Sequence, residues 1–272
     1  MAGHIISRHL SKYDYNTIYN FQESDIFDKN NLYRIVDQST SLINELLNFR
    51  PLFIINCIRC LVQESEDCSE KAILYNSHLP QLLSSKFSQK KTRIIHLSSD
   101  CVFSGKRGDY NEDDYPDGIT MYSRSKILGE IHNGKDLTIR TSYIGPNIDD
   151  SGEELFHWFL MQNNDVLGYN NVYWTGITTL ELAKSVDKII SNPFSGIYHL
   201  VPGKKINKFE LLTIIKNVWG KNEINIKLDK KNLLDRSLVD NRKIIKVNEY
   251  EKMFSDLYLY MLKNKNIYEQ YF

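Results

Sequence analysis

The chain has 272 residues, with 34 basic and 34 acidic side chains, four cysteines and 42% hydrophobic residues. This length suits one large domain or a core domain with a smaller companion, and it can bury a sizeable core. The balanced charge gives no broad electrostatic attraction for nucleic acid or for an anionic membrane, so neither is expected as a partner.

No stretch reaches the roughly 18 consecutive apolar residues that a membrane-spanning helix needs. The first ten residues carry His4, Arg8 and His9 and lack the apolar core and cleavage site of a secretory signal, so a cytoplasmic protein is expected. Cys57 and Cys60 have the spacing of a zinc or redox pair, but no second ligand pair follows, so no metal site is expected. The remaining class is an α/β or α+β protein that acts on something small.

The first half of the chain alternates short apolar runs with stretches of helical periodicity. Strands are expected near residues 17–19 and at 32–36, 53–57, 93–97 and 137–140. Helices are expected at 41–47, 72–83 and 122–132, with a kink or turn at Pro80. Strands that alternate with helices predict a parallel sheet with helices on its faces, and ligands then bind beyond the carboxyl ends of the strands.

The pattern is looser after residue 145. Helices are expected at 153–161, 179–190 and 208–218, and a short strand at 197–200. Residues 1–145, with roughly 172–193, are expected to form the domain of the parallel sheet. Residues 146–171 and 194–272 are expected to form a small, discontinuous α+β domain. Because no Gly/Ser/Pro-rich linker separates the two, we expect them to pack closely.

Ser99, Tyr122 and Lys126 carry the chemistry that the sequence suggests. Ser99 follows the 93–97 strand, and Tyr122 and Lys126 are four residues apart, so they share one face of a helix. A tyrosine phenol titrates at about pH 10 in water, and a neighbouring ammonium lowers that value. Together the three side chains would hold a carbonyl oxygen and protonate it while hydride reaches the carbonyl carbon. A Tyr-x-x-x-Lys pair by itself is a weak signal, because many helices carry one by chance.

The surroundings of this pair make the signal specific. The matching residues, in chain order, are Ser98-Ser99-Asp100, Val102-Phe103-Ser104-Gly105, Glu112-Asp113-Asp114, Pro116, Tyr122, Lys126 and Gly129-Glu130. This segment resembles the extended short-chain dehydrogenase/reductases, and within them the dTDP-4-dehydrorhamnose reductase group. Further similarity lies in Ile54-Ile55-Asn56-Cys57, Tyr75-Asn76, Leu137 to Ser142, Trp174 to Thr179, Gly196 to Leu200 and Asp235-Arg236-Ser237-Leu238.

The resemblance implies a Rossmann-like, doubly wound parallel sheet that binds NADPH or NADH, with a small substrate domain. It implies reduction of the 4-keto group of a nucleotide-linked 4-keto-6-deoxyhexose. Tyr122 would donate the proton, Lys126 would lower its pKa and hold the ribose, and Ser99 would orient the carbonyl. Cofactor contacts are expected from Gly3, Asp37, Cys57, Ile58, Asn76, Tyr122 and Lys126. Substrate contacts are expected from Val102, Phe103, Trp174 and Arg236, although Arg236 is equally well explained as a surface arginine.

The amino-terminal segment departs from the family pattern. The family begins with a strand and a Gly-x-x-Gly-x-x-Gly turn that binds the cofactor pyrophosphate, whereas Gly3 matches only the last glycine. Two interpretations stay open: a start roughly ten residues upstream, or a degenerate member in which the first strand is missing and cofactor binding is weakened. A second departure is Ile58-Arg59, where the family often has a small residue, so a narrower site is expected.

Two other functions stay open. A nucleotide-sugar epimerase or dehydratase would use the same three residues but hold NAD tightly and consume none. A binding module similar to the regulatory β subunit of methionine adenosyltransferase would need a partner chain and show little reductase activity. The residues after the 17–19 strand give neither a clear arginine nor a clear acidic signal, so NAD and NADP are not distinguished. A homodimer is the expected assembly.

Overall fold

The computed structural model describes residues 2–13, 19–21, 32–34, 39–148 and 154–272. Its centre is a four-stranded parallel sheet in the order β10-β5-β4-β3. The four strands are β3 (Phe53–Asn56), β4 (Arg93–Leu97), β5 (Leu137–Arg140) and β10 (Gly196–His199). A separate parallel pair is formed by β1 (Tyr19–Phe21) and β2 (Leu32–Arg34).

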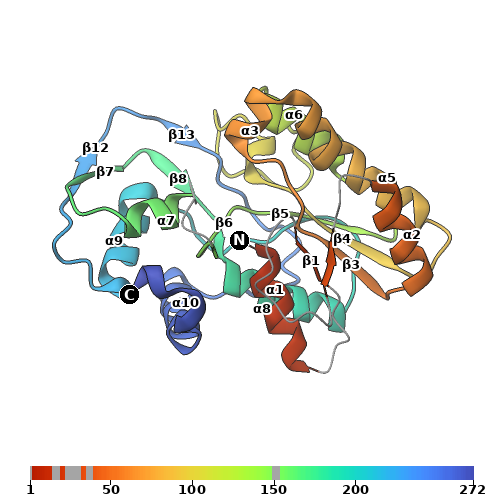
Figure 1. Cartoon of the computed structure of the whole chain (residues 1–272). Helices are drawn as coiled ribbons and strands as arrows, with labels where there is room; N and C mark the ends of the chain where they lie inside the picture. Colours follow the sequence, from red (N-terminus) through yellow and green to blue (C-terminus); the bar gives the residue numbers. More distant parts are fainter. Residues whose placement is uncertain (1, 14–18, 22–31, 35–38, 149–153) are drawn as a thin grey trace.

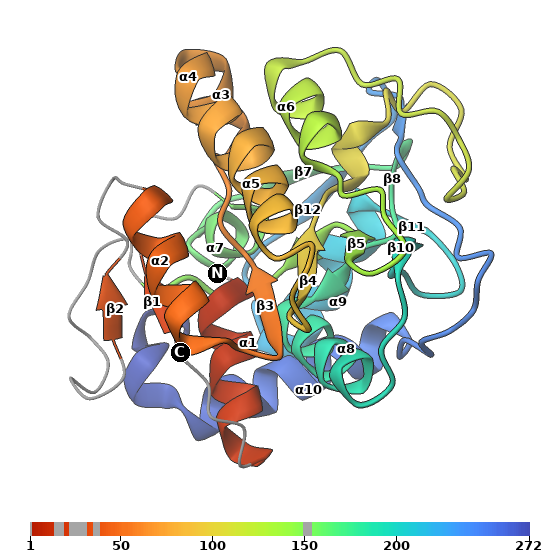
Figure 2. The same ribbon diagram turned by 90° about the vertical axis from the view of Figure 1, so that its right-hand side faces the viewer.

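Helices cover both faces of the main sheet, as Figures 1 and 2 show. On one face lie α2 (Ser39–Phe49), α5 (Leu79–Lys86) and α6 (Met121–Gly129); on the other lie α1 (Ala2–Leu10) and α8 (Thr179–Ser191). Ile94 of β4 joins the core that contains α2 and α5, whereas Ile95 joins the larger core that contains α1 and α8. Successive side chains of a strand point to opposite faces, so the buried run in β4 serves both cores. The doubly wound α/β fold is confirmed.

A second group of helices and small sheets, which we call the second half of the molecule, lies on the left in Figure 1. Its helices are α7 (Leu155–Leu160), α9 (Lys208–Trp219) and α10 (Tyr250–Lys263). Its small sheets are β7 (Val166–Tyr169) with β12 (Ile226–Asp229), and β8 (Val172–Trp174) between β11 (Ile206–Asn207) and β13 (Leu234–Asp235). Between the two halves, β6 (Tyr143–Ile144) pairs with β9 (Ile177–Thr178). Helix α10 contacts α8 and α9 and completes the large core.

Most of the predicted elements are confirmed, with small changes at their ends. The strands at 93–97 and 137–140 are β4 and β5, and those at 53–57 and 197–200 overlap β3 and β10. The helices at 41–47, 179–190 and 208–218 lie within α2, α8 and α9, but those at 122–132 and 153–161 are shorter, as α6 and α7. For the strands near 17–19 and at 32–36, only residues 19 and 32–34 are described, in β1 and β2. Helices α1 and α10 were not predicted.

The helix predicted at 72–83 contains a wide turn in place of the expected kink. After α3 (Val62–Asp67), α4 (Ser69–Ala72) leads into a π-helical segment, Ile73–His78, and then into α5. Pro80 is the second residue of α5 and has no N–H for the carbonyl oxygen four residues earlier. A π-helical turn just before a proline leaves the chain helical while that bond is missing.

Two expected domain boundaries need correction. β10 pairs with β5 in the main sheet, although the sequence assigns residues 194–272 to the smaller domain. β8 pairs with β11 and β13 in the second half, although residues 172–193 are expected in the domain of the parallel sheet, where α8 of that range does pack. A short apolar run predicts a strand but does not indicate the strand with which it pairs. Within the described ranges, each helix is too short or too polar to cross a membrane.

Candidate active site

Helix α6 presents Tyr122 and Lys126 at the carboxyl edge of the main sheet. The Thr120 hydroxyl caps this helix by accepting a hydrogen bond from the Ser123 N–H at 3.1 Å. Tyr122 and Lys126 lie one turn apart, and both side chains are buried. Lys126 Nζ donates to the carbonyl oxygen of Leu97, the last residue of β4, at 2.7 Å. The amine is therefore fixed where the strand ends.

Ser99 lies directly beyond β4 and faces Tyr122. The Ser99 hydroxyl accepts a hydrogen bond from the Cys101 N–H and donates one to the Asp100 carboxylate, both at 3.1 Å. The Ser99 hydroxyl is also among the groups that act on the Tyr122 phenol, whose pKa it lowers. The structure thus brings together Ser99, Tyr122 and Lys126, whose catalytic role stays a prediction.

Burial and one cation shift the protonation of the tyrosine–lysine pair. Burial raises the pKa of the Tyr122 phenol, and the Arg59 guanidinium opposes this shift. Burial, followed by the charge of Arg59, lowers the pKa of Lys126 to about 7, while Glu130 acts in the opposite direction. The Arg59 guanidinium is a positive charge that favours the phenolate of Tyr122, and the expected effect of Lys126 on the phenol stays a prediction.

A buried ion pair holds the end of α6 against the sheet. Glu130 directly follows α6, and its carboxylate accepts hydrogen bonds from Arg140 of β5 at 2.7 and 2.8 Å. The Ser98 hydroxyl donates to the same carboxylate at 2.8 Å. A bidentate, hydrogen-bonded pair offsets much of the desolvation penalty of two buried charges. The glutamate of the Gly129-Glu130 motif therefore positions α6 relative to β4 and β5.

Asn76, whose expected contact with the cofactor stays a prediction, is part of the buried framework beneath the site. Its Oδ1 accepts from the Cys60 N–H at 2.9 Å, and its Nδ2 donates to the Cys60 carbonyl oxygen at 3.2 Å. Nδ2 also donates to the Ser125 hydroxyl of α6 at 3.1 Å. Asn76 has no exposed surface, and these contacts use both ends of its amide. Asn76 ties the loop after β3 to α6.

The other expected cofactor residues that the structure describes lie around the carboxyl end of β3. A Cβ added to Gly3 would lie 3.6 Å from the Cys57 Cβ, so the first turn of α1 packs on this strand end. The Ile58 N–H donates to Asn56 Oδ1 at 3.2 Å, which shapes the loop that follows. Asp37, the expected adenine contact, lies outside the described residues.

The cysteines near this loop are ordinary buried or half-buried thiols. Burial raises the pKa of the Cys57 thiol to about 12, so the thiol stays protonated. All four cysteines are free. Across the described residues, no three or more His, Cys, Asp or Glu side chains come together in a way that could hold a metal ion.

Val102 and Phe103, expected to contact the substrate, are fully buried under the loop after β4. They pack with Tyr110, Val201 and Leu238 in a small core of their own. The rings of Phe103 and Tyr110 stack with their centroids 4.2 Å apart. These two side chains therefore support the loop, and contact of either with the substrate stays a prediction.

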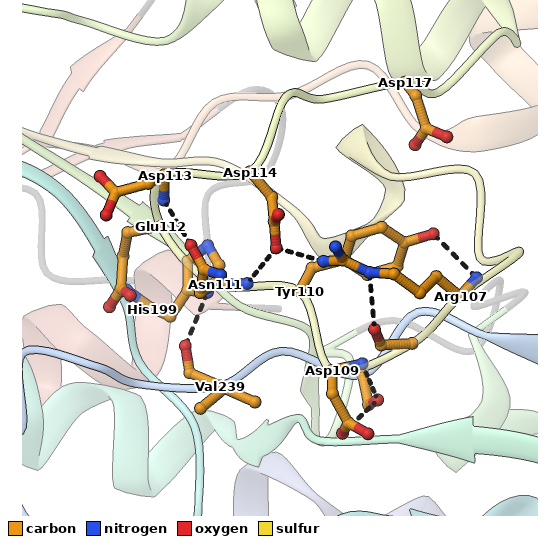
Figure 3. A network of polar contacts seen from close by, with 12 residues as sticks. Arg107, Asp109, Tyr110, Asn111, Glu112, Asp113, Asp114, Asp117, His199 and Val239 are labelled. Atoms are coloured by element: carbon orange, nitrogen blue, oxygen red, sulfur yellow. Dashed lines mark hydrogen bonds and ion pairs between the residues drawn. The ribbon is translucent and has the colours of Figure 1, made fainter.

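The acidic motif of this loop is held by main-chain and ionic contacts (Figure 3). Asp114 pairs with Arg107 and accepts a hydrogen bond from the Asn111 N–H at 2.7 Å. Glu112 accepts one from the His199 N–H at 3.2 Å, which links the loop to β10. Chiefly because of burial, the pKa of His199 falls to about 3, so the ring is neutral. These contacts give the acidic motif a structural role.

Trp174 and Arg236 both lie close to the loops that follow the sheet. Trp174 is only 4% exposed, and its Nε1 donates to the Ser142 hydroxyl at 2.8 Å. Arg236 Nε donates to the Phe103 carbonyl oxygen at 3.1 Å, and an Arg236 terminal nitrogen lies 3.4 Å from Cys101 Sγ. Arg236 is therefore held beside the turn that carries Ser99, which makes it more than a freely solvated arginine. Substrate contact by either residue stays a prediction.

Lys208 and Arg59 are candidate site residues that the sequence did not single out as functional. Lys208, the first residue of α9, has its Nζ 5.2 Å from the centroid of the Trp174 ring. Burial lowers the pKa of Lys208 to about 8, opposed by the charges of Asp100 and Cys101. For Arg59, the only signal in the sequence is a large residue where the family often has a small one. For Lys208 the sequence carries no specific signal.

A comparison with known protein families finds a family that matches most of this chain. The family described as RmlD substrate binding domain matches residues 3–232, which is well over half of the chain. The chain belongs to this family. The resemblance to the dTDP-4-dehydrorhamnose reductase group is thereby confirmed at the level of the family.

The individual proteins that this RmlD-domain chain resembles are described by different functions. The spore coat polysaccharide biosynthesis protein SpsK of Bacillus subtilis is 28% identical over 192 residues, which cover 68% of this chain and 67% of SpsK. The methionine adenosyltransferase 2 subunit beta of Xenopus tropicalis is 24% identical over 192 residues, which cover 64% of this chain and 56% of that subunit. The dTDP-4-dehydrorhamnose reductase of Bacillus anthracis, solved in complex with NADP, is 18% identical with a TM-score of 0.73, over 84% of this chain and 90% of that chain. The last comparison shows a shared fold.

Proposed function

We propose that this RmlD-domain protein reduces the 4-keto group of a nucleotide-linked 4-keto-6-deoxyhexose, with NADPH or NADH as hydride donor. The observation that carries the proposal is the meeting of Ser99, Tyr122 and Lys126 at the carboxyl edge of a parallel sheet. Ligands of open α/β sheets bind beyond this edge. The NADP-bound dTDP-4-dehydrorhamnose reductase of Bacillus anthracis, which has the same fold, supports this choice of substrate and cofactor.

The described residues fit the nicotinamide end of such a cofactor. Lys126 is a buried amine that donates to one main-chain oxygen, so it retains donors for the hydroxyls of a ribose. The first turn of α1 meets Cys57 at the end of β3, and the positive end of a helix attracts phosphate oxygens. Gly3, Cys57, Ile58 and Lys126 would hold the cofactor, whose reduced nicotinamide supplies the hydride when bound.

Tyr122 and Ser99 would act on the carbonyl oxygen of the substrate. Ser99 would donate a hydrogen bond to that oxygen and hold it beside the phenol. Burial raises the pKa of Tyr122, which keeps the phenol protonated at neutral pH. Tyr122 then donates its proton to the oxygen as negative charge develops there. The burial of both side chains excludes water from the transfer.

The substrate diphosphate would lie near Lys208 and Arg236. Both cations come from the second half of the molecule and interact with the turn that carries Ser99: Arg236 contacts Phe103 and Cys101, and Asp100 and Cys101 act on Lys208. Lys208 faces the ring of Trp174, and an aromatic ring beneath a cation is a common wall of a ligand pocket. A diphosphate there would leave the sugar between this wall and Tyr122.

The test is a turnover assay on the full chain. The protein is mixed with NADPH or NADH and a dTDP-linked 4-keto-6-deoxyhexose, and cofactor oxidation is followed by absorbance. We expect oxidation by the wild type and its loss in Tyr122→Phe, because the proton donor is gone. Tyr115→Phe is the matched control, since Tyr115 is 84% exposed, and its activity should equal that of the wild type. A wild type that oxidises neither cofactor contradicts the proposal.

A second candidate function is a binding subunit without turnover. Its support is the similarity to methionine adenosyltransferase 2 subunit beta, for which the match is 24% identical. Such a module would bind a nicotinamide nucleotide or a partner chain and oxidise no NADPH with any keto sugar. Calorimetric titration of NADPH, run beside the turnover assay, separates the two functions. An epimerase or dehydratase would instead convert the sugar nucleotide with no net oxidation of the cofactor.

A further inference from the structure

Arg59 and Glu154 form an ion pair that joins the two halves of the molecule. Arg59 lies in the loop between β3 and α3, and Glu154 directly precedes α7, 95 positions later. The Arg59 guanidinium also lies over the Tyr143 ring, 4.9 Å from its centroid. Both ionic side chains are largely covered, at 23% and 21% exposed. A carboxylate and an aromatic face thus fix the guanidinium at the edge of the main sheet.

The fixed guanidinium acts on the groups that surround it. Its positive charge lowers the pKa of four neighbours: Cys57, Tyr122, Lys126 and Tyr143. A guanidinium stays charged across the whole working range of pH. Lys126, whose pKa is about 7, is only partly charged at neutral pH. The constant positive charge beside Tyr122 therefore belongs to Arg59.

The other groups around the Tyr122 phenol are neutral in this structure. The Ser99 hydroxyl, the Cys101 thiol and the Tyr143 phenol come from the turn after β4 and from β6. Burial raises the pKa of the Cys101 thiol to about 12, so it carries no charge near neutrality. The Glu66 carboxylate of α3 accepts the main-chain N–H of Tyr122 at 3.3 Å and thus faces the backbone of α6.

Lys126 has a different set of neighbours. The Glu130 carboxylate favours its ammonium form, but this carboxylate is already paired with Arg140. The His96 ring of β4 interacts with Lys126, and burial holds the pKa of that ring well below its ordinary value. The Cys57 thiol is protonated, as described above. None of these groups supplies a second positive charge near Tyr122.

We propose that Arg59 is a positioning residue for Tyr122 and Lys126: held by Glu154 and Tyr143, its guanidinium supplies a permanent positive charge beside Tyr122. The catalytic consequence rests on the proposed reduction, in which Tyr122 donates a proton. A permanent positive charge makes the phenol a stronger acid and stabilises the phenolate that remains after proton transfer. Glu154 moderates this effect, because its negative charge offsets part of the guanidinium charge.

The first test uses the full chain without substrate. The ionisation of Lys126 is followed by NMR of the lysine ε-methylene groups in isotope-labelled protein, with Lys126→Met to assign the signal. The wild type should titrate with a midpoint of about 7. Arg59→Met should raise the midpoint by about one pH unit, because a nearby like charge is removed. Glu154→Gln should lower it, because the guanidinium charge is no longer offset.

Two further variants make the first test specific. Arg59→Lys keeps a cation at the same place, so its midpoint should lie closer to that of the wild type. Lys71→Met with Glu64→Gln removes an exposed ion pair between α4 and α3 and should leave the midpoint unchanged. Should Arg59→Met fail to fold, Arg59→Lys and Glu154→Gln still test the direction of the shift.

The second test measures turnover with NADPH and the 4-keto sugar nucleotide. At a pH well above the Lys126 midpoint of both proteins, where this amine is uncharged in each, Arg59→Met should lower kcat by about tenfold, because the phenol becomes a weaker acid. The KM for NADPH should change little, and Arg59→Lys should recover part of kcat. A loss of cofactor binding with unchanged kcat would point to a merely structural role and contradict the inference.

The outcomes separate this inference from the proposed function. Opposite shifts of the Lys126 midpoint in Arg59→Met and Glu154→Gln support the charge arrangement, even where the wild type oxidises no NADPH and the proposed reduction fails. If the wild type reduces the sugar nucleotide but Lys126 titrates at the same pH in every variant, the result contradicts this inference and leaves the proposed function standing. Shifts of the same sign in both variants would also overturn it, because they indicate a general disturbance of the loop.

Discussion

Gly129 of α6 lies directly against the main chain of Asn76 in the π-helical turn. A Cβ added to Gly129 would be 1.8 Å from the Asn76 carbonyl oxygen and 3.1 Å from Pro80 Cγ. Pro80 has no N–H, so the α-helical hydrogen bond from four residues ahead to that oxygen cannot form. This close contact sets the separation between the helix that carries Tyr122 and Lys126 and the helical segment that follows β3.

Gly129→Ala should therefore destabilise the protein and misplace the site. The added methyl group meets main-chain atoms, which cannot move as a flexible side chain can, so we expect a loss of about 1–3 kcal/mol in the free energy of unfolding. Urea unfolding measures this loss, and kcat should fall because Tyr122 moves with α6. Gly134→Ala is the matched control, since nothing lies within 4 Å of an added Cβ there. Equal stability of the two variants would rule out this account of Gly129.

Arg140→Met should be among the most damaging single changes near the site. It leaves the buried Glu130 carboxylate without its partner, and removal of one member of a buried ion pair typically lowers stability by about 3–5 kcal/mol. The double variant with Glu130→Gln should recover part of that loss, because no unpaired charge remains. Unfolding curves of the two single variants and the double variant give the coupling. If the stability losses of the two single variants simply add up in the double variant, the two side chains are not coupled.

Lys126 should make the stability of the protein rise with pH above neutrality. Its pKa is about 7 in the folded protein against an ordinary value of 10.5, so between these values the unfolded chain binds more protons. The free energy of unfolding therefore increases with pH through that window. The contribution of Lys126 to it is lowest below the pKa of the folded protein. The stability difference between wild type and Lys126→Met, measured by urea unfolding, should rise across the same window. A difference that is flat with pH would contradict the shifted pKa.

The parts of the fold and site that the sequence predicts are those encoded by local pattern. β4 and β5 are short stretches rich in isoleucine and leucine that are followed by polar residues, and Tyr122 and Lys126 are separated by one helical turn, so neither feature depends on distant residues. The Arg59–Glu154 pair is different, because its members are 95 positions apart and leave no periodic mark in the sequence. The burial of Asn76 and the pairing of β10 with β5 depend in the same way on tertiary packing.

Lys208 should contribute to substrate binding and little to the chemical step. Its Nζ lies over the Trp174 ring beside the Ser99 turn, where the diphosphate of the proposed substrate would lie. In Lys208→Met we expect the KM for the sugar nucleotide to rise about tenfold or more, because a charge-assisted hydrogen bond is lost. The KM for NADPH and kcat should change far less. Lys204→Met, at an exposed lysine nearby, is the control and should behave as the wild type.

The pH dependence gives this last prediction a second readout. Lys208 has a pKa of about 8, so in the wild type the ammonium loses its proton above that pH, and the KM for the sugar nucleotide should then rise. In Lys208→Met this rise should be absent, because no titrating amine remains. Steady-state measurements from neutral to alkaline pH compare the two proteins. The same rise in both would assign the dependence to another group and remove Lys208 from the diphosphate site.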